Sequence, residues 1–257
     1  MFKQVNSFIP VLIVPVLISA ALTGCRTAGS PDPGTAQTPV YQESQGLETE
    51  GIGKMKMPGE KNTQLLEAAA KGDAEKVRTL IGEGAGVNAQ DSNGNTPVMA
   101  AAINRHPDAV RVLLEAGADV NIRNDRSDNL FLYAGAEGDM ELLRLAISAG
   151  ADPALTNRYG GTALIPASER GHADIVRELL TRTQVDVNHV NRLGWTALLE
   201  AVILGDGGEV HQSIIRLLLE HGADVNLPDG DGVTAYRHAV SRNFTAIAAM
   251  LEAAGGR

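Results

Sequence analysis

Residues 62–257 alternate two kinds of apolar segment at regular intervals. One kind is short and built from small side chains, as in the alanines at 100–102. The other carries aliphatic side chains at i, i+3 and i+4, as at Val110, Leu113 and Leu114, which is the stripe of an amphipathic helix. The alternation predicts pairs of helices, in which the first is short and closely packed and the second buries one face.

The start of each predicted pair is marked by a Thr or Asn that recurs along the chain. These residues are spaced 33, 33, 33, 34 and 38 positions apart: Thr63, Thr96, Asn129, Thr162, Thr196 and Thr234. A side-chain oxygen at such a place can accept a hydrogen bond from an unpaired amide of the first helical turn. Self-similarity at this period is typical of a solenoid, in which one unit cannot bury its apolar face and the stack of units does so.

A second signature closes the units. It is complete at 117–121 and 222–226, as Gly-Ala-Asp-Val-Asn, and partial elsewhere. The two signatures in phase, with helical segments between them, resemble the ankyrin repeat. The resemblance covers residues 62–257 and implies an all-α solenoid of about six helix-turn-helix repeats with projecting β-hairpin turns. The sequence departs from the family pattern at Asn129-Leu130, where Thr-Pro is usual, and at Pro166, which falls inside a predicted first helix.

The ends of the second helices carry their own signals. Gly84, Gly117, Gly150 and Gly222 each predict a left-handed C-cap, and repeat four lacks this glycine. Repeat five carries about five extra residues around 205–209, between its two helices. Such an insertion is either a partner contact or drift in a tolerant loop.

The first 24 residues form a predicted lipoprotein signal peptide. Lys3 supplies the positive start, and residues 9–21 form an apolar middle that is too short for a comfortable transmembrane helix. The segment ends in Leu-Thr-Gly-Cys at 22–25, which resembles a bacterial lipobox; the resemblance implies cleavage before Cys25 and lipidation of its thiol. Cys25 is the only cysteine in the chain, so an internal disulfide is excluded. The alternative is an ordinary signal peptide with a chance cysteine.

The segment 25–61 is predicted to be the lipidated cysteine and a flexible linker. Its few large apolar groups cannot bury enough surface to offset the entropy of ordering. In the lipoproteins that this signal resembles, Asp directly after the cysteine favours inner-membrane retention, so Arg26 favours the outer membrane. We therefore expect a periplasm-facing protein, lipid-anchored to a bacterial membrane.

Charge and motif content argue against several classes of function. The formal net charge of −9 argues against nucleic acid, whose phosphates require a basic footprint. The sequence holds no phosphate loop and no Gly-x-Ser-x-Gly, and its six histidines lack the i, i+4 spacing of a helical metal pair. Asp119, Asp152, Asp186 and Asp224 follow the repeat period, which identifies them as turn residues rather than an acid–base pair. We expect no catalysis, no cofactor and no metal.

The remaining chemistry is binding. The resemblance to ankyrin repeats implies a concave groove formed by the hairpin tips and the exposed side of the first helices. Carried onto this sequence, the variable tip positions include Arg126, Arg158, Tyr159, Arg192, Leu193 and Trp195, and those on the first helices include Glu169, Arg170, Ile203 and Leu204. Trp, Tyr and Arg dominate binding energies, and a row of arginines on an acidic protein suggests an acidic patch on the partner. The alternative is that Trp195 covers its hairpin and the arginines only confer solubility.

Two functions are compatible with a lipid-anchored binding module. The first is an inhibitor of one protein partner: bacterial ankyrin lipoproteins of this type resemble immunity proteins that neutralise secreted toxins, such as type VI lipase effectors. The second is an accessory or assembly factor for a periplasmic enzyme or envelope complex. In both cases we expect a monomer that contacts the membrane through the lipid on Cys25.

Overall fold

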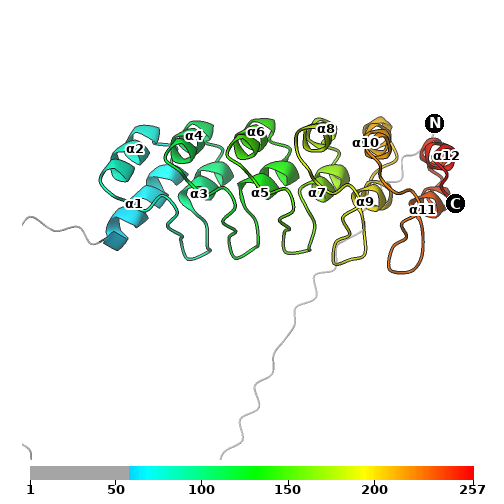
Figure 1. Ribbon diagram of the computed structural model, residues 1–257, viewed down its shortest axis with the longest axis horizontal. Coiled ribbons are helices and arrows are strands. Elements are labelled where there is room, and N and C mark those ends of the chain that lie inside the picture. Colours follow the sequence, from blue (N-terminus) through cyan, green and yellow to red (C-terminus); the bar gives the residue numbers. More distant parts are fainter. Residues whose placement is uncertain (1–57) are drawn as a thin grey trace, which may run out of the picture. The chain divides into compact units, whose positions relative to one another are not determined.

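The computed structural model describes residues 58–257, which form six stacked pairs of helices (Figure 1). The signal peptide predicted for 1–24 and Cys25 lie outside the described residues, as does nearly all of the predicted linker. The helices are α1 (Pro58–Ala70), α2 (Ala74–Gly82), α3 (Pro97–Ile103), α4 (Pro107–Glu115), α5 (Leu130–Glu137), α6 (Met140–Ser148), α7 (Leu164–Glu169), α8 (Ala173–Arg182), α9 (Ala197–Ile203), α10 (Glu209–Glu220), α11 (Ala235–Ser241) and α12 (Thr245–Ala253). The all-α solenoid of six repeats is thereby confirmed.

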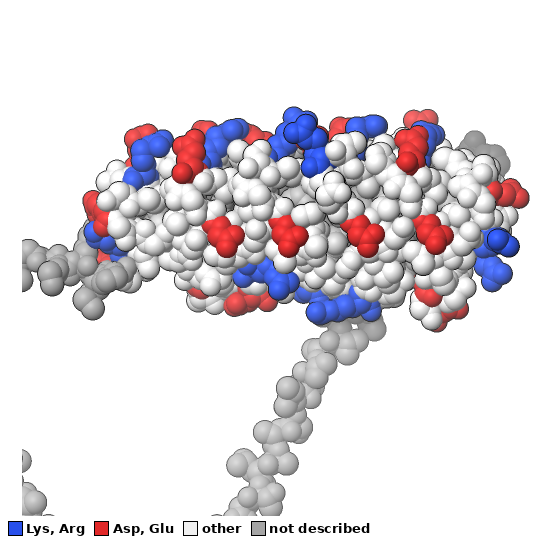
Figure 2. All heavy atoms as spheres, viewed as in Figure 1, with Lys and Arg blue, Asp and Glu red and all other residues white. Residues whose placement is uncertain are grey.

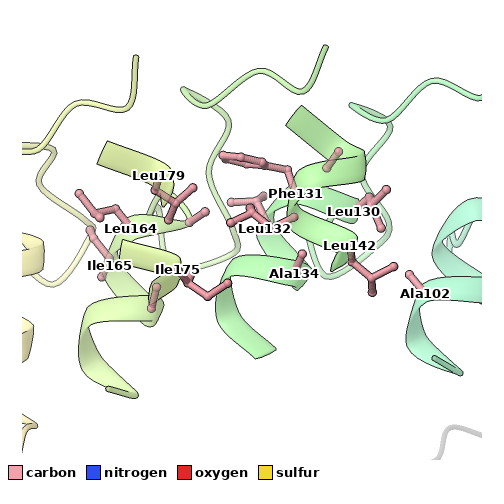
Figure 3. Close-up of a cluster of buried hydrophobic side chains, with 14 of the residues drawn as sticks. Ala102, Leu130, Phe131, Leu132, Ala134, Leu142, Leu164, Ile165, Ile175 and Leu179 are labelled. Atoms are coloured by element: carbon pink, nitrogen blue, oxygen red, sulfur yellow. The ribbon is translucent and has the colours of Figure 1, made fainter. Parts of the chain in front are cut away.

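The helices form two layers. The first helices of the six repeats pack against one another in order, from α1 to α11, and the second helices pack likewise from α2 to α12. A single hydrophobic cluster runs through both layers, and Figure 3 shows part of it around α5 and α7. The small alanines of the first helices, such as Ala101 and Ala102, are fully buried, which lets these helices approach closely. Each inner repeat therefore packs against the repeat before it and the repeat after it, as a solenoid requires.

The predicted helix caps are confirmed at four of the six positions. Thr96, Thr196 and Thr234 each accept a hydrogen bond from the amide three residues on, and so does Asn129 in the weaker copy. Thr63 is an exception: α1 begins at Pro58, before the predicted domain start at 62, so Thr63 lies inside the helix and its hydroxyl donates to the carbonyl of Gly59.

Thr162 does not cap its helix either, and Pro166 is the reason. Proline has no N–H, so the carbonyl of Thr162 receives no bond from position 166 and instead accepts a longer one, 3.3 Å, from the amide of Ile165. In a capped helix the same Ile165 amide would donate to the Thr162 hydroxyl instead. The hydroxyl is left buried without a partner, and α7 has only six residues.

This contrast gives a matched pair of substitutions. Thr196→Val should lower the free energy of unfolding by about 1 kcal/mol, because valine keeps the shape of threonine and removes the cap. Thr162→Val should leave that free energy unchanged or raise it, since the lost hydroxyl is buried and unpaired. Urea unfolding of both variants measures the difference. Equal losses at the two positions would contradict the account of Pro166.

The turns between repeats also follow the sequence. Gly84, Gly117, Gly150 and Gly222 have φ between 82° and 88°, as predicted for left-handed caps. Where repeat four lacks the glycine, the Thr183 hydroxyl donates to the carbonyl of Leu179. The projecting tips are tight turns closed by backbone hydrogen bonds, and residues 58–257 contain no strand. Within the same residues no helix has the length and apolarity needed to cross a membrane.

The insertion at 205–209 lies between α9 and α10, as the sequence predicts. Directly after it, Val210 and His211 of α10 lie over Gly171, at 3.3 Å and 3.7 Å from the position of a Cβ there, where His172 lies over Gly138 in the preceding repeat. The His211 ring bonds to Asp206 at 2.9 Å and to the carbonyl of Glu169 at 3.0 Å. On the other side, the Arg242 guanidinium of repeat six donates to the carbonyl of Gly205 at 3.0 Å, so the extra residues are tied to both flanking repeats.

Candidate protein-binding face

A concave cavity of about 870 Å³ runs along the loop tips and the first helices of the middle repeats. Eight of the ten predicted binding residues line it: Arg126, Arg158, Tyr159, Leu193 and Trp195 from the tips, and Glu169, Arg170 and Leu204 from α7 and the end of α9. We call this site the concave cavity. The Trp195 side chain is half-buried against the core and also lines the cavity.

Arg192 and Ile203 do not line the concave cavity. The guanidinium of Arg192 donates to the carbonyl of Arg158 at 2.9 Å, and its backbone amide donates to the carbonyl of Tyr159 at 2.9 Å. Its stem crosses Gly160, where a Cβ would lie 2.9 Å from Arg192 Cγ. Arg192 therefore joins two tips and lies beside the cavity. Ile203 is half-buried against the core.

The arginines of the tips and the cavity differ in their partners. Arg126 lies 3.9 Å from Asp128, and Arg170 pairs with Glu137 at 2.9 Å. Arg158 donates to the Tyr159 hydroxyl and covers its ring at 4.7 Å. Neither Arg158 nor Arg192 forms a salt bridge among the described residues, although the Asp128 carboxylate lies close enough to Arg158 to be affected by its charge. Figure 2 shows positive groups gathered at the loop tips near the middle of the array.

Large apolar side chains stand next to these two arginines. Tyr159 is 53% exposed and Leu193 57% exposed, and both lie at the tips of adjacent repeats. Exposed apolar side chains that are grouped and rimmed by polar groups are typical of interaction sites. The tips of repeats four and five thus combine the residue types that form binding hot spots.

The cavity floor contains a carboxyl that the sequence reasoning missed. Glu200 on α9 is only 5% exposed, and its Oε1 accepts a hydrogen bond from Asn191 Nδ2 at 2.8 Å. Burial raises the pKa of Glu200 to about 7, with a contribution from the nearby Glu169 carboxylate, although the Asn191 bond opposes the rise. At neutral pH this group is divided between its charged and neutral forms.

The helical period of the sequence indicates the position of Glu200. Leu204 is predicted from its place on the exposed side of the first helix, and Glu200 lies four residues before it, on the same helical face. Tyr133 bears the same relation to Glu137, and both line the concave cavity. The sequence prediction took only the C-terminal end of each first helix as exposed, and Glu200 lies one helical turn closer to the N-terminus on the same face.

The histidines and recurrent aspartates act structurally. His106 and His172 cover the preceding repeat's glycine, and His238 bonds to Asp229 at 2.7 Å. Asp119 and its equivalents Asp152, Asp186 and Asp224 accept the amide two residues on, which confirms them as turn residues. In the described part of the chain, no three His, Cys, Asp or Glu side chains are grouped to hold a metal ion.

Comparison with known proteins places the chain in a family. A family profile described as ankyrin repeats (3 copies) matches residues 46–124 and 130–229, and a second, ankyrin repeats (many copies), matches 211–252. The chain belongs to the ankyrin repeat family, whose members are generally protein–protein interaction modules and typically not enzymes.

Individual relatives agree with this. The chain is 47% identical to an ankyrin repeat domain of Acinetobacter baumannii, whose crystal structure superposes with a TM-score of 0.73 over 75% of this chain and 98% of that one. The ankyrin repeat domain of Bcl-3, a member of the IkappaB family, is 26% identical, with a TM-score of 0.68 over 76% of this chain and 86% of that domain. The putative ankyrin repeat protein YahD of Escherichia coli K12 is 52% identical over 87 residues, 34% of this chain and 43% of YahD. The chain spans less than half the length of the curated relatives it matches.

Proposed function

We propose that this protein holds one protein partner through the concave cavity and the adjoining tips of repeats four and five. The observation that carries the proposal is the pair of exposed arginines that form no salt bridge among the described residues, Arg158 and Arg192, beside the exposed Tyr159 and Leu193. Their charge fits an acidic patch on the partner, which would steer association and fix the orientation of the complex.

We further propose that the module is anchored through a lipid on Cys25 and faces the periplasm, at the outer membrane. The lipobox-like Leu-Thr-Gly-Cys at 22–25 supports this, and if the segment of about 35 residues after it behaves as the flexible chain that its composition predicts, the repeats would reach roughly 30–35 Å from the membrane. Such a position suits a monomeric inhibitor of a toxin that attacks the envelope, for example a secreted lipase. The second candidate is an accessory or assembly factor for a periplasmic enzyme.

Capture of the partner from envelope extract tests the binding face. The bait is the full chain, and the test variant changes Arg158, Tyr159, Arg192 and Leu193 to Ala, all of which are exposed. Because single hot-spot truncations cost about 2 kcal/mol or more, we expect the variant to bind at least about a hundredfold more weakly. The control variant changes Arg177, Arg182 and Arg216 of the second helices, which are equally exposed, and should bind like the wild type.

The identity of the captured protein separates the two functions. A toxin favours the inhibitor, and a resident envelope enzyme favours the accessory factor. If both variants retain the same partner, the proposed face is wrong, and the insertion at 205–209 becomes the next surface to change. A Cys25→Ser variant that still binds its partner but no longer protects or assists the cell would support the role of the anchor.

A further inference from the structure

Glu200 has an unusual position for a charged side chain. It is 5% exposed, lines the concave cavity, and bonds through Oε1 to Asn191. Its other carboxylate oxygen has no hydrogen-bond donor among the described residues. The buried side-chain atoms without a partner in the described residues are Asn129 Nδ2 and Thr162 Oγ1, so this oxygen of Glu200 is accessible from the concave cavity and open to a donor from outside the chain.

The loop tip does not require this carboxyl. Asn191 closes its tip by accepting the amides two and four residues on, and Asp91 and Asn157 close theirs in the same way. In those two repeats the position equivalent to Glu200 is occupied by Ala100 and Pro166, which form no such bond. In repeat six His238 occupies this position and bonds to the tip residue Asp229 at 2.7 Å, so the contact between tip and helix can also be made without an acid here. Repeat five therefore carries an acid that the architecture can do without.

The charge of Glu200 is also uncompensated within the described chain. Asp128, a carboxyl that lines the same cavity, has Arg126, Arg158 and Arg170 near it, and these arginines oppose the rise in pKa that burial imposes on it. The charge acting on Glu200 is that of another acid, Glu169. Arg170 could have balanced the pair, but it is held by Glu137 and by the carbonyl of Ala136.

We infer that Glu200, with Glu169 beside it, forms a subsite for a lysine side chain of the partner. This inference rests on the proposed function, because the concave cavity is the partner's binding face. An ammonium group would supply the missing donor, balance the two carboxyls, and lie in a cavity lined by Trp195, whose ring face attracts cations. The partner would then present acidic groups to the tips and one lysine to the floor.

The subsite should respond to pH through Glu200. The charged and titratable groups on the elements packed against α9 include Glu169 at the end of α7, Arg170 directly after it, His211 on α10, and His238 on α11 with its partner Asp229. Only the ionised carboxylate attracts an ammonium group, and with a pKa of about 7 its ionised fraction changes about tenfold between pH 8 and pH 6. Lysine stays protonated throughout this range.

Binding of n-butylammonium, the analogue of the lysine side chain, tests the subsite on the full chain. Trp195 is the only tryptophan, so its fluorescence reports occupancy of the cavity directly. We expect saturable change with n-butylammonium at constant ionic strength, none with 1-butanol, and about tenfold weaker binding at pH 6 than at pH 8. Glu200→Gln, which keeps the acceptor for Asn191, should weaken binding at least about tenfold, whereas Asp128→Asn should not.

The unfolding temperature provides a second measurement in case binding does not change the fluorescence of Trp195. If the ammonium group binds, n-butylammonium raises the unfolding temperature of the wild type at pH 8 and has no such effect on Glu200→Gln. Equal binding to both proteins, or no effect in either measurement, overturns the subsite. In that case capture of a partner through the tips still supports the proposed function. Conversely, Glu200-dependent binding of n-butylammonium without any captured partner supports the subsite and counts against the proposed function.

Discussion

Phe131→Ala should lower the free energy of unfolding by about 3–5 kcal/mol. Phe131 is fully buried on α5 and is among the largest side chains in the core, where it lies in one cluster with Leu130, Leu132 and Leu164 (Figure 3). Truncation removes its transfer free energy and leaves a cavity in the third of six repeats. Since each repeat stabilises both neighbours, loss of a central interface affects the stack on both sides. Urea unfolding followed by far-UV circular dichroism measures the change.

Phe131→Leu is the matched control. The equivalent positions in the next two repeats hold Leu164 and Leu198, both buried, so the fold accommodates leucine at this place. We expect a loss below about 1.5 kcal/mol, because most of the volume and all of the apolar character remain. A loss below about 1 kcal/mol for Phe131→Ala itself would show that α5 and its neighbours collapse into the vacated space.

Much of the fold can be predicted from the sequence because the same caps, turns and apolar positions recur in several repeats. The caps at Thr96 and Thr196, the left-handed glycines and the insertion at 205–209 each depend on local chemistry that the sequence displays directly. Even Asn129, which departs from the family pattern, caps its helix, because an amide oxygen accepts the same bond as a hydroxyl.

The features that the sequence did not predict arise where two local effects compete or where a contact joins distant residues. Thr162 has the right type and spacing for a cap, but Pro166 alters which amide its carbonyl accepts. Arg192 occupies a tip position, yet its bonds to the neighbouring tip keep it out of the concave cavity. Burial of Glu200 depends on how adjacent repeats stack, which no single repeat's sequence specifies.

Glu200→Gln should stabilise the protein by about 3 kcal/mol at pH 8 and have almost no effect at pH 4. The folded state raises the pKa of Glu200 from 4.5 to about 7, and each tenfold increase in proton affinity corresponds to about 1.4 kcal/mol. Because the folded protein holds this proton more tightly, the stability contributed by the group is complete below pH 4.5 and is lost as the pH rises through 7. Glutamine keeps the acceptor for Asn191 and carries no charge at any pH.

Thermal unfolding of the two proteins across pH 4–8 measures this difference. For a domain of this size, about 3 kcal/mol corresponds to an increase of about 6–12 °C at pH 8. Glu115→Gln, at an exposed position at the end of α4, is the control and should show no pH-dependent gain. A constant difference between Glu200→Gln and the wild type would mean that Glu200 titrates in its ordinary range. If Glu200→Gln both raises stability at pH 8 and weakens n-butylammonium binding, one substitution separates stability from recognition. The carboxyl that destabilises the free protein is then the one that binds the lysine. This is expected where function retains a group that folding disfavours.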